Sequence, residues 1–310
     1  MDELYQEPFA SPCTTLTKAG VTSTLARMNS IPTWLSFFLF TILLSIPFYL
    51  QLRQSAGDKK RFERVFRRLL LIPGVVGIGF RIIERRAFDD LINVTNRPWL
   101  LVGVILLPIL MELLVILASK IFTLADIDGR VLNFSGGTVN ISPSVQLALG
   151  NKPQSVLRFI ANIVYTVFLG TLAFVVFTLF EEMGWRGYLQ GELIDAFGIT
   201  WGTFIGGILW GIWYIPLVLQ GYQFPEYRRL GAFLFMPMFT IALSMMNGWL
   251  YVLAGNIWVP ALLNAATKIT TPMGIEALGE AGYSRRIRLV WAWVWLVVAG
   301  LGLALWQSGS

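Results

Sequence analysis

Residues 159–190 read FIANIVYTVFLGTLAFVVFTLFEEMGWRGYLQ, and this stretch decides how the chain folds. Residues 159–180 carry no charge, and a helix needs about 20 apolar residues to cross the hydrocarbon core of a membrane. Two carboxylates, Glu181 and Glu182, follow at once. A charged side chain at the centre of a membrane helix costs about 2.5–3.5 kcal/mol, so such a group faces a cavity or a partner and is a candidate for a functional site.

The composition places the whole chain in a membrane. Hydrophobic residues make up 55% of the 310 residues and charged residues 14%, and the mean hydropathy is +0.65. A soluble domain has about 25% charged residues. Stretches long enough to span, with Glu112 as the only charge among them, are residues 34–52, 98–119, 159–180, 197–220, 230–267 and 289–306.

The fifth stretch is too long for one straight helix, so we expect a helix over 230–253, a break at Gly255 and a shorter helix over 257–268. The sequence thus predicts an all-α integral membrane protein with about seven transmembrane helices. We expect a multi-pass protein of the cell (plasma) membrane.

The sequence predicts one integral membrane domain with an N-terminal tail. Residues 1–32 are largely polar and lack the context of a cleaved signal peptide, so we expect them to stay on as an N-terminal tail. Residues 33–310 form the membrane domain. Within it, VLNFSGGTVNIS alternates apolar and polar residues around two glycines, which predicts a small hairpin cap at 130–142.

A basic connector, residues 53–90, separates the first two spans. Its part from 53 to 86 holds ten Lys or Arg against three acidic residues, so the positive-inside rule places it in the cytoplasm. The apolar stretch 69–80 is too short to span and indicates a half-buried interfacial helix beside anionic lipid. We expect no nucleic-acid partner, because the basic residues alternate with apolar runs and no nucleic-acid motif accompanies them.

The helix around Glu181 carries the candidate chemistry. Glu182 and Arg186 are spaced i,i+4 in the orientation that favours an ion pair on one face. Glu181 lies about 100° further round the helix and can point into a different space, where it could accept a proton. The alternative is that both carboxylates are merely solvated at a helix end.

Metal and cofactor chemistry is not predicted. The chain has no histidine, which is the commonest metal ligand and the usual proton shuttle at neutral pH, and Cys13 is its single cysteine. Only carboxylates remain as ligands, and these suit Mg²⁺, Ca²⁺ or Mn²⁺ better than zinc.

Three segments together resemble the CAAX-protease and bacteriocin-processing (CPBP) family of intramembrane endopeptidases. These are EEMGWRGYLQ (181–190), ILWGIWYIPLVL (208–219) and NIWVPALLNAATK (256–268), and the similarity covers about 159–268. The resemblance implies that a Glu and a His activate a water, while a second His and an Asn stabilise the oxyanion. Glu181, Glu182 and Arg186 match the family pattern.

Three polar positions depart from that pattern. Tyr214 and Asn264 stand where the family has its histidines, and Lys268 stands where it has Asn or Asp. A phenol titrates near pH 10 and is a poor base, whereas Asn264 could still donate to an oxyanion. If the family arrangement holds, Lys268 would form an intramembrane ion pair with Glu181, and Glu181 could then no longer act as a base.

Other readings stay open for several of these residues. Tyr214 could be an aromatic at the membrane interface, and Asn264 could only tie two helices together. Glu112 is expected to pair with an Arg or Lys of a neighbouring helix, or else to be a second functional carboxylate.

Three functions compete. The favoured one is a catalytically degenerate CPBP homologue that binds a membrane protein or peptide in the former active-site cavity, in a regulatory or assembly role. The second is an active endopeptidase in which Glu181 activates water, helped by Tyr214 and Asn264. The third is a transporter-like or purely structural membrane subunit, which the lack of an internal repeat disfavours.

Overall fold

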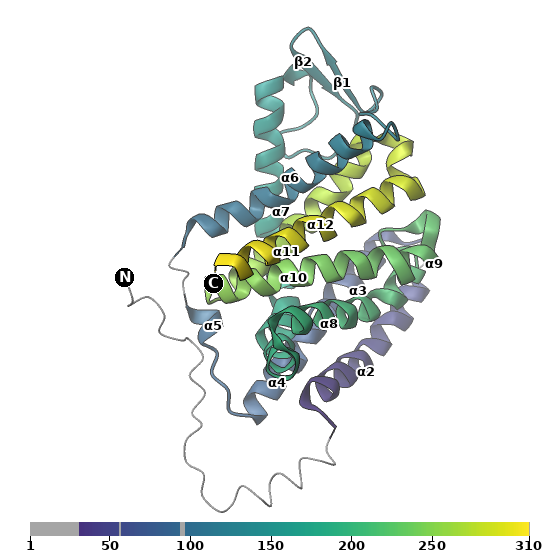
Figure 1. Cartoon of the computed structure of the whole chain (residues 1–310). Helices are drawn as coiled ribbons and strands as arrows, with labels where there is room; N and C mark the ends of the chain where they lie inside the picture. Colours follow the sequence, from purple (N-terminus) through teal and green to yellow (C-terminus); the bar gives the residue numbers. More distant parts are fainter. Residues whose placement is uncertain (1–30, 56, 94–96, 310) are drawn as a thin grey trace, which may run out of the picture.

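The computed structural model describes residues 31–55, 57–93 and 97–309, and these residues form a helical bundle with a small sheet at one end (Figure 1). Seven helices have 19 or more residues. They are α2 (Thr33–Gln54), α6 (Trp99–Ile121), α7 (Val156–Gly184), α8 (Gly191–Leu219), α10 (Met236–Ala254), α11 (Trp258–Ala277) and α12 (Arg285–Gly309). The short helices are α3 (Lys59–Leu69), α4 (Ile72–Ile83), α5 (Asp89–Ile92) and α9 (Arg228–Leu230). The prediction of an all-α protein is confirmed.

Five stretches of the described chain are long and apolar enough to cross a membrane. These are Thr33–Gln54, Trp99–Ile121, Val156–Leu219, Pro225–Ala254 and Arg285–Leu305. The third holds both α7 and α8. Helix α11 is not among them, because its polar residues lower its hydropathy, and it packs between α6, α7 and α10 instead. The protein is an integral membrane protein.

Helix α7 does not end where the uncharged run ends. It passes through a π-helical turn, η1 (Trp185–Gln190), directly into α8. The chain then turns at Gly198, whose φ of 74° and ψ of 166° favour glycine. After the turn, Gly202 lies against the backbone of Leu193 and Ile194. The helix predicted over 197–220 is therefore the part of α8 that follows this turn.

Glycines set the distance between α8 and α10. A side chain at Gly207 would overlap the backbone of Ile241, and one at Gly211 would press on Pro237 and Thr240. The small-residue spacing therefore serves close helix packing.

The break predicted at Gly255 is confirmed, since Gly255 ends α10 in the left-handed conformation with φ 64°. The predicted end of the next helix at residue 268 is wrong, because α11 continues to Ala277. The residues beyond 268 include two threonines and a proline, which suggest a loop in sequence. In the fold, Thr270 and Thr271 are buried, and the Thr270 hydroxyl donates to the Ala266 carbonyl within the helix.

A three-stranded antiparallel sheet caps the bundle beyond the start of α7 (Figure 1). Strands β1 (Leu132–Ser135) and β2 (Thr138–Ile141) form the predicted hairpin. Gly136 and Gly137 make its turn with φ of 55° and 78°, as a type I′ turn requires. The two-residue strand β3 (Gln154–Ser155) pairs with β2 and was not predicted.

The basic connector folds as two helices. The basic residues of α3 are exposed, while Val65, Phe66 and Leu69 are buried. One face of helix α4 is buried against protein, since Gly74 and Gly77 lie against the α7 backbone near Phe180 and Gly184. An interfacial position of this helix, and contact of the basic segment 53–86 with anionic lipid, stay predictions.

We expect Gly184→Ala to destabilise the protein by about 1–3 kcal/mol, because the added methyl group would overlap the backbone of Pro73 in α4. Gly191→Ala is the matched control, since nothing lies within 4 Å of its added methyl group. That control should leave stability unchanged or raise it by about 0.4–1 kcal/mol. Unfolding in detergent would measure both, and equal effects would show that the α4–α7 contact is loose.

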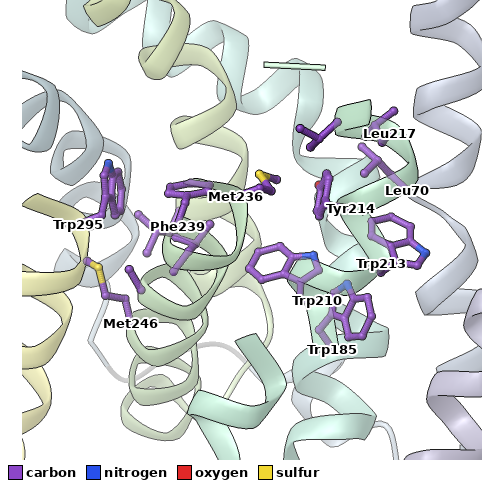
Figure 2. Close-up of a cluster of buried hydrophobic side chains, with 14 of the residues drawn as sticks. Leu70, Trp185, Trp210, Trp213, Tyr214, Leu217, Met236, Phe239, Met246 and Trp295 are labelled. Atoms are coloured by element: carbon purple, nitrogen blue, oxygen red, sulfur yellow. The ribbon is translucent and has the colours of Figure 1, made fainter. Parts of the chain in front are cut away.

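Large aromatic side chains fill the centre of the bundle. Figure 2 shows Trp185, Trp210, Trp213 and Tyr214 close together, and each is at most 3% exposed. The Tyr214 ring lies 5.0 Å from that of Trp213, measured between centroids. Trp210 and Tyr214 of this cluster contact the acidic residue Glu181 near the end of α7.

Candidate active site

The structure brings the six predicted side chains together at the centre of the bundle. Helix α7 supplies Glu181 and Glu182, η1 supplies Arg186, α8 supplies Tyr214, and α11 supplies Asn264 and Lys268. The first five are at most 2% exposed, and the Lys268 side chain is 13% exposed. The carboxylates are therefore not a solvated helix end, and Tyr214 is not an aromatic at the membrane interface.

Both oxygens of Glu181 are engaged. Oε1 accepts hydrogen bonds from the Tyr214 hydroxyl at 2.8 Å and from Trp210 Nε1 at 3.0 Å. Oε2 accepts from Asn264 Nδ2 at 3.2 Å and lies 3.4 Å from Lys268 Nζ. The ion pair that the sequence predicts between Glu181 and Lys268 is present.

Lys268 also contacts the phenol. Its Nζ donates to the Tyr214 hydroxyl at 3.0 Å, and that hydroxyl in turn donates to Glu181. Lys268, Tyr214 and Glu181 thus form a closed cycle of contacts around one carboxylate. Within this cycle Tyr214 already uses its proton, so it is a donor to Glu181 and not a base.

Glu182 has its own partners. Its Oε2 lies 2.9 Å from Arg186 Nη1, as the spacing predicts, and its Oε1 accepts from Asn264 at 2.6 Å and Asn247 at 3.3 Å. The Arg186 guanidinium lies over the Trp210 ring at 4.3 Å. The expectation that Glu181 points into a separate space is wrong in one respect, because the Asn264 amide bridges both carboxylates.

Two contributors escaped the sequence reasoning. Asn247 of α10 binds Glu182, and Trp210 donates to Glu181 from its indole nitrogen. Asn247 carried a usable signal, since it is an amide in an otherwise apolar stretch. Trp210 carried none beyond its place in the second family segment, since a tryptophan 29 residues from Glu181 looks the same in sequence whether it donates or only packs.

The match to known proteins covers this region. Residues 162–270 match the family model for type II CAAX prenyl endopeptidase Rce1-like proteins, a range that contains all six side chains. The matched range is about a third of the chain, and over it the chain is similar to the Rce1-like proteins of the CPBP family.

A curated relative is similar in sequence to part of the chain. It is a CAAX prenyl protease 2 from Methanococcus maripaludis, 34% identical over 73 residues. The match covers 23% of this chain and 26% of the relative, so the chain matches about a quarter of that protein's length.

The space left at this site is small. A cavity of about 10 Å³, lined by Tyr214, Gln223, Thr240, Asn264 and Lys268 among others, has room for the centre of about one water molecule. Among residues 31–309, apart from 56 and 94–96, no group of three or more acidic or cysteine side chains could hold a metal ion. As it stands, the site can hold one small polar molecule beside Lys268, but not a peptide.

Glu112 lies apart from this candidate active site. Its Oε1 accepts from Thr271 of α11 at 2.9 Å and from Trp291 of α12 at 3.1 Å. The expected pairing with an Arg or Lys is wrong for the described residues, because no cation lies within 4.0 Å of its carboxylate and two neutral donors take that place.

Proposed function

We propose that this protein is a catalytically degenerate CPBP homologue that binds a membrane protein or peptide at its former active site, in a regulatory or assembly role in the plasma membrane. The observation that carries the proposal is the contact of Lys268 with both Glu181 and Tyr214. A carboxylate that activates water needs a free oxygen beside that water. Both oxygens of Glu181 are held by four donors.

The chemistry of the replaced side chains supports the same conclusion. With no histidine in the chain, no imidazole can take a proton from water and pass it to a leaving group. The Tyr214 phenol and the Lys268 ammonium are both donors in the observed contacts. Neither can replace a base at neutral pH.

Partner binding needs the Lys268 side chain to move, because the present cavity does not admit a peptide. Groups that could meet a partner are at hand. The Oδ1 atoms of Asn247 and Asn264 are buried and accept no hydrogen bond from the described residues. Buried polar atoms of this kind are costly unless they find a donor, so a peptide N–H group that reaches them would be held.

The retained pair of carboxylates supports a second candidate, an active endopeptidase in which Glu181 activates a water held in the 10 Å³ cavity. One experiment distinguishes the two proposals. Purified protein is incubated with a library of membrane-protein peptides beside Glu181→Ala. We expect no difference in cleavage between the two, measured by mass spectrometry of the products.

Cleavage that Glu181→Ala abolishes would overturn the degenerate reading and support the second candidate. Glu276→Ala is a suitable control, because Glu276 lies outside the site and bonds to Tyr283. A contaminating protease would act equally with all three preparations.

A further inference from the structure

A second cavity lies between α6, α7, α11 and the sheet cap. Its volume is about 180 Å³. Its wall is almost wholly apolar and includes Ile116, Phe159, Ile163, Val167 and Met273. None of its lining residues lines the small cavity beside Lys268, so it is a separate site.

The single acid in this wall is Glu112. Its side chain is 95% buried, since 5% of the residue is exposed. Oε1 accepts two hydrogen bonds, but no described residue donates to Oε2. Gly274 of α11 packs against the Glu112 side chain of α6, and a Cβ there would overlap Oε2. The glycine therefore makes room for the carboxylate, which lines the cavity.

Among the described residues, Glu112 forms no ion pair within 4.0 Å. Arg288 of α12 is close enough to attract it, yet the ion pair of Arg288 within 4.0 Å is with Glu226. A buried carboxylate is costly unless it is paired. The apolar cavity therefore offers one unpaired acceptor, Oε2 of Glu112, to a ligand that enters it.

We propose that this cavity binds an amphiphilic primary amine, with its ammonium at Glu112 and its apolar body among the side chains of α7 and α11. The size fits, because an apolar cavity of about 150 Å³ can bind benzene. Charge complementarity selects the head group, since an ammonium supplies both the donor and the cation that Oε2 lacks. Two exposed side chains, Phe134 of β1 and Leu113 of α6, are among those that line the cavity.

The probe is 2-phenylethylamine, and 2-phenylethanol is its neutral counterpart. Binding to protein in nanodiscs is measured by calorimetry, with empty nanodiscs as the reference for partition into lipid. We expect the amine to bind about tenfold or more tightly than the alcohol. Glu112→Gln should weaken the amine by about tenfold or more and change the alcohol little, since the glutamine keeps an acceptor for Thr271 and Trp291.

A second variant keeps the proposal falsifiable if Glu112→Gln does not fold. Ile163→Trp fills the cavity and should abolish binding of both compounds. Glu276→Gln, an acid outside the cavity, should leave both affinities unchanged. Equal affinity for amine and alcohol, or amine binding that survives Ile163→Trp, would overturn the proposal.

Discussion

Replacing Lys268 with methionine is expected to destabilise the folded protein by about 3–5 kcal/mol, because it leaves the Glu181 carboxylate buried without its cation. Methionine keeps the length and apolar stem of the side chain but removes the donor to Glu181 and Tyr214. The cost is of this size because Glu181 is fully buried. The free energy of unfolding in mixed micelles, followed by tryptophan fluorescence, measures it.

The double variant Glu181→Gln with Lys268→Met tests the cause. Without the carboxylate, the lost ammonium should matter little, and removing both members of a buried pair is often close to neutral. Lys152→Met is the matched control at an exposed lysine. If the double variant is as unstable as Lys268→Met alone, the stability comes from packing of the lysine and not from the ion pair.

Restoring the family pattern is expected to create a protease. The triple variant Tyr214→His, Asn264→His and Lys268→Asn places imidazoles at two positions whose side chains already contact Glu181. It also removes the ammonium that holds Glu181. A positioned general base contributes about 10²–10⁴-fold in rate, so peptide cleavage by the triple variant should rise by that order over the parent protein.

Adding Glu181→Ala to the triple variant is the control for this gain. The quadruple variant should lose it, because the water then has no carboxylate beside it. Each variant also needs a measured unfolding transition, so that an inactive protein can be told from an unfolded one. A folded triple variant that cleaves nothing would mean that positions 214, 264 and 268 do not stand in for the family's catalytic side chains.

Much of the fold could be predicted from hydropathy and from glycines that end a helix or form a hairpin turn. The uncharged runs locate the long helices, Gly255 ends α10, and the Gly136–Gly137 pair turns the hairpin. The turn at Gly198 could not be predicted, because it lies in an apolar run with several other glycines. The full length of α11 could not be predicted either, because burial against α6 and α7 decides whether a segment with threonines and a proline continues as a helix.

The candidate site was predictable as a set of residues but not as a network. Spacing along one helix gives the Glu182–Arg186 pair, and the family resemblance aligns Asn264 and Lys268 with Glu181. The bridge from one amide to both carboxylates depends on how α11 lies against α7, and no pattern within either helix encodes that. For the same reason the neutral donors to Glu112, which come from α11 and α12, were missed.

The burial of α11 has a consequence for biogenesis. Among the seven long helices of the described residues, α11 alone is too polar to be a candidate span. It carries the buried Asn264 and the partly buried Lys268. Charged and polar side chains of this kind are costly in lipid, and the carboxylates of α7 give them polar partners. Since α7 is synthesised first, we expect α11 to insert against α7, where Lys268 pairs with Glu181, and not to partition into lipid by itself.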